Sequence, residues 1–304
     1  MKTLKICASL AVLFFAGCGN APSNEAAFNI QAHRGAGLAR PENTLESFEW
    51  SWGSEGITPE ADLRTTKDGI IVCFHDKNFK RVTVGLAEKT KELGVEALAF
   101  AEAQKLDVGS FRGDQFAGQR IPALTRVFEA MQDRPERMIY LDIKEMKTED
   151  YEKLANLIKK YGVTAQAIFT TSHYDLITQW KEIMPDSPTL LWNGGTQKKL
   201  DAKLKLVRDA GFAGITFLQI HVHLKKDYDL ASAEPFSSPT IPFLEQTRDE
   251  LAEHDVIFQL LPWKNNDPAV FTYLLELGAK SFATDYPEVT FNAVQEFQNK
   301  KGED

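Results

Sequence analysis

The stretch FNIQAHRGAGLARPENTLESF, residues 28–48, decides which of two α/β folds the sequence predicts. It reads as a short strand, a turn broken by Gly35 and Gly37, and the letters PENT running into a helical pattern. A doubly wound open sheet is expected to carry a glycine-rich phosphate loop after its first strand. HRGAGLA does not match G-x-G-x-x-G with the right strand-to-helix spacing, so the stretch favours a barrel.

Strand-like and helix-like segments alternate from this stretch to the end of the chain. We expect strands at residues 28–34, 57–66, 138–144, 167–172, 188–193, 214–222, 256–263 and 281–285. Helical patterns lie at residues 44–56, 150–162, 174–185, 199–211, 243–255, 269–279 and 289–300. Eight strands, each followed by helical material, predict a (β/α)8 TIM barrel of the α/β class.

Two departures from this alternation are expected. A short extra strand, residues 69–76, follows the second strand through a turn at Asp68-Gly69, which is a strong hairpin signal. About 60 residues, 77–137, then precede the third strand and hold helical patterns at 97–107 and 123–132. We expect a small insertion over the barrel mouth, too short and too polar to form a core of its own.

The composition limits the kinds of partner. With 304 residues and 43% hydrophobic content, the chain can bury a large core. Its net charge of −8 argues against a general nucleic-acid binder, which needs a basic face to displace counterions. Any phosphate binding must therefore be local.

The first residues do not belong to the predicted barrel. Residues 1–17 combine two lysines with an apolar run too short to span a membrane, which is typical of a secretory signal. FFAGC resembles a bacterial lipobox, which implies cleavage before Cys18 and lipid attachment to it. A plain signal peptide or a short buried helix is the alternative. We therefore expect a tether at 18–27, one domain at 28–304, and an exported lipoprotein on the periplasmic or cell-surface face of a membrane.

Two pairs of side chains are expected to face the barrel lumen. Residues two apart on a strand project to the same side, which pairs Glu60 with Asp62 and Asp142 with Lys144. If these strands line a barrel, both pairs lie near the C-terminal strand ends, where barrel active sites form. Three converging carboxylates repel one another unless a cation neutralises them, and hard oxygen ligands suit Mg²⁺ or Ca²⁺ better than zinc.

Two histidines accompany these pairs. His33 ends the first expected strand and His75 the extra one, and together they can serve as general acid and base. Arg34 and Lys144 can hold a phosphoryl oxygen. Asp76 follows His75 directly, but neighbours in a strand point to opposite sides, so the pattern does not require Asp76 to orient His75.

Five ordered motifs carry a family resemblance. HRG…PENT, PEADLRTTKDGIIVCFHD, GQRIPALTRVFEAM, LDIK and FATDYPE closely resemble the glycerophosphodiester phosphodiesterases in order and spacing. The resemblance covers roughly residues 29–290 and is densest between 31 and 76. It implies a barrel that holds one divalent cation, Mg²⁺ or Ca²⁺, and two histidines that cleave a phosphodiester.

The resemblance also implies individual roles. His33 and His75 become the acid–base pair, and Glu60 and Asp62 become metal ligands. The third ligand is usually Glu in that family; here it is Asp142, one methylene shorter.

Further residues match the family's supporting positions. Arg34 and Lys144 match its phosphate-binding residues. Glu42 is expected near the cation or His33, Asn43 is expected to hold the turn, and Asp285 is expected to have a structural role.

The far rim of the predicted pocket is less determined. Trp263, in LLPWKNN, stands where the family often has Trp followed by Thr, and is expected to wall the substrate pocket. His221 and His223 on the sixth expected strand could read a head group, bind a second metal, or be ordinary surface or core histidines. The role of His173 is equally open.

The leading interpretation is metal-dependent hydrolysis of glycerophosphodiesters to glycerol phosphate and an alcohol. One alternative is a phospholipase D-type lyase that acts on intact or lyso-phospholipids in the same barrel. Another is a non-catalytic lipoprotein that binds phosphorylated ligands. The insertion lacks a long apolar loop, which favours small soluble substrates, and the full set of histidines and carboxylates argues against the non-catalytic interpretation. Oligomeric state and the choice between a cyclic-phosphate route and direct attack by water stay open.

Overall fold

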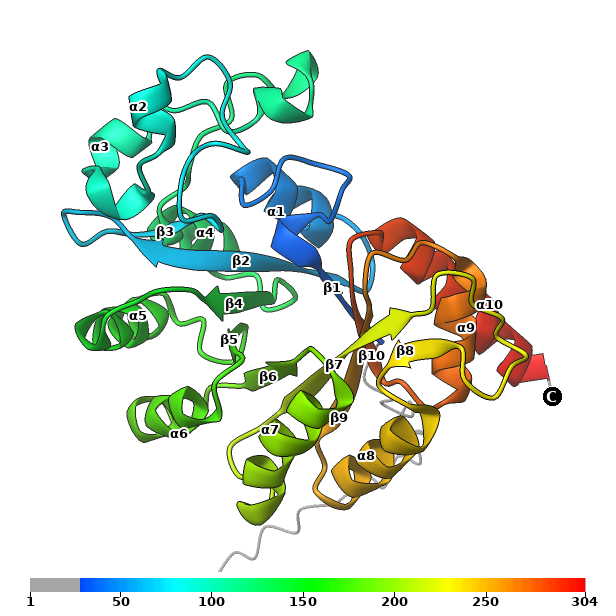
Figure 1. The fold of residues 1–304 in the computed structure, drawn as a ribbon. Helices are drawn as coiled ribbons and strands as arrows, with labels where there is room; N and C mark the ends of the chain where they lie inside the picture. Colours follow the sequence, from blue (N-terminus) through cyan, green and yellow to red (C-terminus); the bar gives the residue numbers. More distant parts are fainter. Residues whose placement is uncertain (1–27, 304) are drawn as a thin grey trace, which may run out of the picture.

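The computed structural model of the chain describes residues 28–303, and in this part eight parallel strands close into a barrel surrounded by helices (Figure 1). The barrel strands are β1 (Asn29–Ala32), β2 (Ile57–Thr65), β4 (Ile139–Ile143), β5 (Ala167–Thr171), β6 (Thr189–Asn193), β7 (Phe217–Leu224), β9 (Ile257–Pro262) and β10 (Ser281–Thr284). Because β1 pairs with both β10 and β2, the sheet has no open edge there. The predicted (β/α)8 barrel is confirmed.

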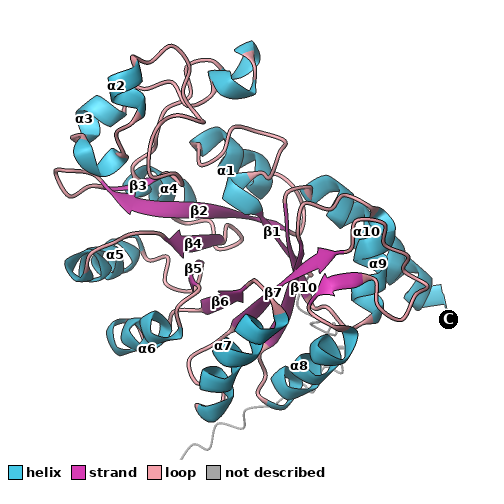
Figure 2. Cartoon of the chain, viewed as in Figure 1, coloured by secondary structure: helices cyan, strands magenta, loops and turns pink. Residues whose placement is uncertain are grey.

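One outer helix follows each barrel strand in the chain order. Figure 2 shows the helices, in cyan, arranged around the strands, in magenta. These helices are α1 (Leu45–Trp52), α4 (Leu124–Met131), α5 (Thr148–Tyr161), α6 (Tyr174–Ile183), α7 (Gln197–Asp209), α8 (Ile241–Glu253), α9 (Pro268–Glu276) and α10 (Pro287–Glu303). Outward-facing strand residues such as Leu141, Phe169 and Leu218 pack with the buried faces of these helices in the main core. This burial supplies most of the apolar stabilisation of the barrel.

The first strand is shorter than expected, and the difference shapes the site. It ends at Ala32, and residues His33–Gly35 form a 3₁₀ turn in which Arg34 has a φ of 54°. Gly37 allows this turn to approach the end of β10, since a Cβ at Gly37 would collide with the carbonyl oxygen of Asp285. The turn therefore carries His33 and Arg34 out of the strand ladder and toward the barrel mouth.

Two short strands extend barrel strands as antiparallel hairpins. The expected extra strand is β3 (Ile71–Cys73), which pairs with β2 but ends two residues before His75. A second hairpin strand, β8 (Phe236–Ser238), pairs with β7 and was not predicted. A three-residue strand inside a polar, proline-containing segment gives no alternation that a sequence pattern could reveal.

The insertion after His75 has an apolar cluster of its own, which corrects the expectation that it is too polar for one. Its elements are α2 (Glu88–Lys91), η2 (Val95–Ala97), α3 (Phe100–Ala103), η3 (Ser110–Arg112) and η4 (Asp114–Phe116). Phe79 is fully buried, its ring lies 5.2 Å from that of Phe74, and Val72 of β3 joins the same cluster. These apolar residues are separated from one another along the sequence, so no periodic pattern indicated that they would form a cluster.

The later part of the predicted insertion belongs to the barrel. The helix expected at 123–132 is α4, and its apolar stripe of Leu124, Val127, Phe128 and Met131 is buried in the main core. α4 is therefore the outer helix between β2 and β4. The other expected helix, 97–107, is reduced to the single turn of α3 and part of η2.

Within residues 28–303, no helix is both long and apolar enough to cross a membrane. The predicted signal at 1–17, the tether at 18–27 and Cys18 lie outside the described residues.

Candidate active site

Three carboxylates meet at the C-terminal ends of neighbouring strands. Glu60 and Asp62 extend from β2 and Asp142 from β4, and Asp62 lies directly opposite Asp142 in the strand register. One oxygen from each of the three lies within 4.8 Å of the others, and each residue is at most 5% exposed. The structure therefore brings together the three carboxylates that the period-two pattern placed on one side of their strands.

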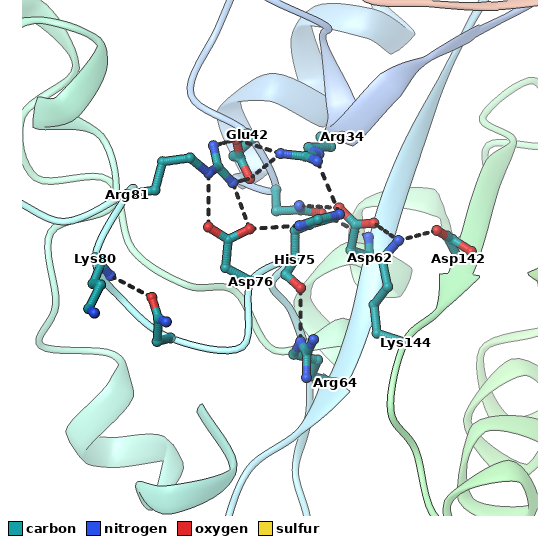
Figure 3. Close-up of polar contacts among 12 residues, drawn as sticks. Arg34, Glu42, Asp62, Arg64, His75, Asp76, Lys80, Arg81, Asp142 and Lys144 are labelled. Atoms are coloured by element: carbon teal, nitrogen blue, oxygen red, sulfur yellow. Dashed lines mark hydrogen bonds and ion pairs between the residues drawn. The ribbon is translucent and has the colours of Figure 1, made fainter. Parts of the chain in front are cut away.

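Two polar side chains hold Asp62 in this cluster. The ammonium group of Lys144 lies 2.9 Å from Oδ1 of Asp62 and also pairs with the carboxylate of Asp142 (Figure 3). The Asn43 amide donates to Oδ2 of Asp62 at 2.6 Å, and its oxygen accepts from the Asp62 backbone N–H at 2.9 Å. Asn43 adopts a φ of 55°, so it both makes the turn, as expected, and anchors a carboxylate.

The three carboxylates of the cluster carry more negative charge than Lys144 neutralises. Burial raises the pKa of Glu60 to about 7, with His33 opposing the shift and the two aspartates adding to it. Burial likewise raises the pKa of Asp142, whereas Lys144 and nearby cationic groups outweigh burial and hold the pKa of Asp62 well below its usual range. One ammonium group thus faces three buried carboxylates, a set of hard oxygen donors that fits a divalent cation.

His33 and His75 are each held by a carboxylate through Nδ1. His33 Nδ1 lies 2.6 Å from Oδ1 of Asp285, and His75 Nδ1 lies 2.7 Å from Oδ1 of Asp76. The strand pattern left open whether Asp76 orients His75, and the structure shows the contact. The two side chains can meet because the backbone has left the extended strand after Cys73, so strict alternation no longer applies. Asp285, expected to be structural, is in direct contact with His33.

Arg34 lies between His75 and Glu42. Its Nη2 is 3.0 Å from Nε2 of His75, and its Nη1 is 3.4 Å from both carboxylate oxygens of Glu42. Glu42 was expected near the cation or His33, but its contacts are with two guanidinium groups, those of Arg34 and Arg81. A nearly buried carboxylate is stabilised most by fixed positive charges, and these two lie nearest.

An aromatic wall spans the mouth across β6, β7 and β9. The rings of Trp192 and His221 stack with centroids 5.4 Å apart, and His221 stacks in turn on Trp263 at the same centroid separation. Burial lowers the pKa of His221 to about 3, so its ring is neutral. The ring of His223 also contacts Trp263, with centroids 5.8 Å apart. Trp263, the expected pocket residue, is 39% exposed at the end of this stack.

Trp192 is a site residue that the motifs did not indicate. Its indole N–H donates to Oδ1 of Asp142 at 3.1 Å, and so holds one of the three carboxylates of the cluster. The available signal was positional: Trp192 lies one residue before the end of β6, on the lumen side of its strand.

A cavity of about 660 Å³ opens beside these groups. Its lining includes His75 and Lys144 of the site, together with Arg64, Lys77 and His173. His173 therefore borders space that a ligand can occupy, although it contacts neither the carboxylates nor the two candidate acid–base histidines through any hydrogen bond among the described residues.

A closed barrel whose mouth carries buried carboxylates, carboxylate-held histidines and two cationic side chains is typical of enzymes that cleave phosphate esters. The model of the glycerophosphoryl diester phosphodiesterase family matches residues 33–289. The chain belongs to this family, and is thus an enzyme of the phosphoric diester hydrolase class.

Similar proteins cover most of the chain. A glycerophosphodiester phosphodiesterase of Caldanaerobacter subterraneus subsp. tengcongensis is 29% identical over 272 residues, spanning 88% of this chain and 97% of that protein. A human lysophospholipase D is 26% identical over 278 residues, spanning 84% of this chain and 82% of that protein.

Solved structures agree on the fold. A glycerophosphodiester phosphodiesterase from Agrobacterium tumefaciens superposes with a TM-score of 0.64 at 18% identity, covering 86% of this chain and 98% of that one. A phosphodiesterase from Oleispira antarctica, in complex with the product sn-glycerol-3-phosphate, gives 0.66 at 21% identity, covering 88% and 96%.

The contact between His33 and Asp285 predicts a pH dependence of stability. Burial alone would lower the pKa of His33, but the carboxylates of Glu60 and Asp285 outweigh it and raise that pKa. A histidine whose pKa is higher in the folded chain than in the unfolded chain stabilises the fold at pH values below its unfolded pKa of about 6.5. This contribution is lost as the pH rises through the pKa of the folded chain. Asp285→Asn should therefore reduce the loss of unfolding free energy between about pH 6 and pH 8.

Urea unfolding across this pH range measures the effect. Asp249→Asn is the matched control, because Asp249 is exposed and its pKa is lowered, so that it titrates far below pH 6. An Asp285→Asn variant with the same pH slope as the wild-type chain would contradict the assigned cause.

Proposed function

We propose that the chain hydrolyses glycerophosphodiesters to glycerol phosphate and an alcohol, with a divalent cation and a pair of histidines. The observation that carries the proposal is the convergence of three buried carboxylates with two carboxylate-held histidines at one end of the barrel. Membership of the family and the name of the Caldanaerobacter relative support the substrate class. The sn-glycerol-3-phosphate bound to the Oleispira structure is the expected product.

The cation would be Mg²⁺ or Ca²⁺, held by Glu60, Asp62 and Asp142. When bound, it supplies positive charge that stabilises the phosphoryl oxygens. Asn43 and Trp192 keep two of these carboxylates in place through the hydrogen bonds described above.

Arg34 and Lys144 would bind the phosphodiester anion. The guanidinium group offers a planar fork to two oxygens, and the ammonium group acts as a point charge beside the carboxylates. Positive groups fixed before the reaction offset the charge that grows on the non-bridging oxygens as the bond to the leaving group breaks.

The hydrogen bonds of the two histidines support a division of roles between acid and base. The Arg34 guanidinium can only donate, so Nε2 of His75 accepts from it, and the Nδ1–H of His75 donates to Asp76. In this tautomer Nε2 carries no proton. When the Arg34 guanidinium turns from Nε2 to the phosphate, the Nε2 lone pair is released, and His75 would then take a proton from the attacking oxygen. His33, whose pKa is raised, gives a proton to the leaving alkoxide. The attacking oxygen belongs to a neighbouring hydroxyl of the substrate or to water.

A second candidate function follows from the relatives. Proteins of human and mouse that match most of this chain are named lysophospholipase D. In this chain the aromatic wall ends at the half-exposed ring of Trp263, which could contact either a small alcohol or a lysolipid. A substrate panel that includes lysophosphatidylcholine separates the two functions.

The principal test is phosphorus NMR of the purified chain with glycerophosphocholine, glycerophosphoethanolamine and lysophosphatidylcholine. Glycerol phosphate should form with Mg²⁺ or Ca²⁺ and should stop forming after chelation. His33→Ala and His75→Ala should each lower kcat by about 10²- to 10⁴-fold, because each removes a proton-transfer group.

His254→Ala is the control for these variants, since His254 is exposed and packs against Phe212 on the outside of the barrel. Glycerol phosphate release that needs no cation, or no cleavage of any glycerophosphodiester, would sink the proposal. Lysophosphatidylcholine cleaved in preference would favour the second candidate.

We also propose that the chain is exported and attached to a membrane through a lipid on Cys18. The lysines, the apolar run and the FFAGC ending of the first residues support this proposal. Cys18→Ser should move the protein from the membrane fraction to the soluble fraction of cells. A variant that stays in the membrane fraction to the wild-type extent would contradict the anchor.

A further inference from the structure

Arg81, in the first loop of the insertion, bridges two carboxylates at the barrel mouth. Its Nη2 lies 2.7 Å from Oε1 of Glu42, and its Nη1 pairs with the other Glu42 oxygen. The same guanidinium group donates to Asp76, from Nε at 2.8 Å and from Nη2 at 2.9 Å (Figure 3). These two bidentate carboxylate contacts use four of the five N–H donors of one arginine.

Both carboxylates also contact groups of the proposed reaction. Asp76 accepts from Nδ1 of His75, and Glu42 lies 3.4 Å from the Arg34 guanidinium group, which in turn donates to Nε2 of His75. The five side chains thus form a closed ring of polar contacts. Arg81 closes this ring at the point opposite His75 and Arg34.

The backbone alone does not fix the positions of the Arg34 and His75 side chains. Arg34 belongs to a 3₁₀ turn and His75 follows the end of β3, so neither lies in the strand ladder of the barrel. Side-chain contacts must therefore set how their reactive atoms face one another. A displacement of about 1 Å at such atoms can cost about 100-fold in rate.

The distances within the ring indicate how Arg81 acts on Arg34. Glu42 is only 8% exposed, and its contact with Arg81 is shorter than its contact with Arg34. If Arg81 were absent, the buried Glu42 charge would depend on Arg34 alone and would draw that guanidinium group away from the phosphate. Arg81 thus satisfies Glu42 and leaves Arg34 available for substrate.

We propose that Arg81 is a positioning residue that holds His75 through Asp76, and frees Arg34 by occupying Glu42. The inference rests on the proposed phosphodiesterase function and ties the insertion to that reaction. Lysine cannot replace Arg81, because an ammonium group offers no planar fork that spans two carboxylates.

Kinetics of variants test this role. Arg81→Ala and Arg81→Lys should each lower kcat by about 10- to 100-fold and raise KM. The kcat of the lysine variant should exceed that of the alanine variant by no more than about threefold. Added methylguanidinium should restore part of the activity of Arg81→Ala and none of that of His75→Ala. Lys80→Ala is the matched control, because Lys80 precedes Arg81 and pairs with Glu92 on the surface.

A double-mutant cycle asks whether Arg81 acts through Asp76. On an Asp76→Asn background, Arg81→Ala should lower kcat by a smaller factor than it does in the wild-type chain, because only its contact with Glu42 is then left to lose. Losses that multiply in full would mean that Arg81 does not act through Asp76, and would overturn the inference. Arg81→Ala or Arg81→Lys with wild-type kcat and KM would overturn the inference while leaving the proposed function intact.

A spectroscopic measurement tests the contact without turnover. Nitrogen-15 NMR should show His75 in its Nδ1-protonated tautomer in the wild-type chain and in Lys80→Ala, and a mixture of tautomers in Arg81→Lys. An unchanged His75 spectrum in Arg81→Lys would overturn the inference. A wild-type chain that cleaves none of the diesters would overturn the proposed function, and the spectrum would still decide whether Arg81 holds the histidine.

Discussion

The mutual repulsion of three buried carboxylates is the constraint on which the rest of the site depends. Glu60, Asp62 and Asp142 lie within one another's reach in a place that water scarcely enters, and Lys144 supplies only one compensating charge. Such a cluster is costly for a fold unless a further cation is held there. The strand register of β2 and β4 places these groups together, so the cost arises from the same geometry that forms the site.

The surrounding polar groups follow the same logic of paired charge. His33 and His75 each contact a carboxylate of their own, and the basic groups Arg34 and Arg81 share Glu42. These four basic side chains thus each have an acidic neighbour. An acidic protein can in this way present a local site for a phosphodiester anion without a basic surface.

The sequence allowed the barrel and the carboxylates to be predicted, because strand periodicity is a local property. Glu60 and Asp62, two apart on one strand, had to share a side wherever the strand lay. The contacts of Asp76, Asp285 and Trp192 could not be predicted in this way. They depend on chain segments that leave the strand geometry, or on how distant strands meet around the barrel.

The structure of the insertion could not be predicted from local sequence patterns either. Phe79 and its apolar neighbours are separated from one another in a polar sequence, and the fold gathers them with Val72 of β3 into one cluster. Arg81, two residues after Phe79, is thereby carried to the mouth, where it meets Glu42 and Asp76. No periodic pattern in that loop signals such a contact.

The most direct test of the carboxylate cluster is anomalous X-ray diffraction from crystals of the chain grown with Mn²⁺, which takes the oxygen ligands typical of Mg²⁺ and Ca²⁺. The account predicts one strong anomalous peak within about 2.0–2.6 Å of an oxygen from each of Glu60, Asp62 and Asp142. No peak at this position in fully Mn²⁺-loaded crystals, with Lys144 alone between the carboxylates, would contradict it.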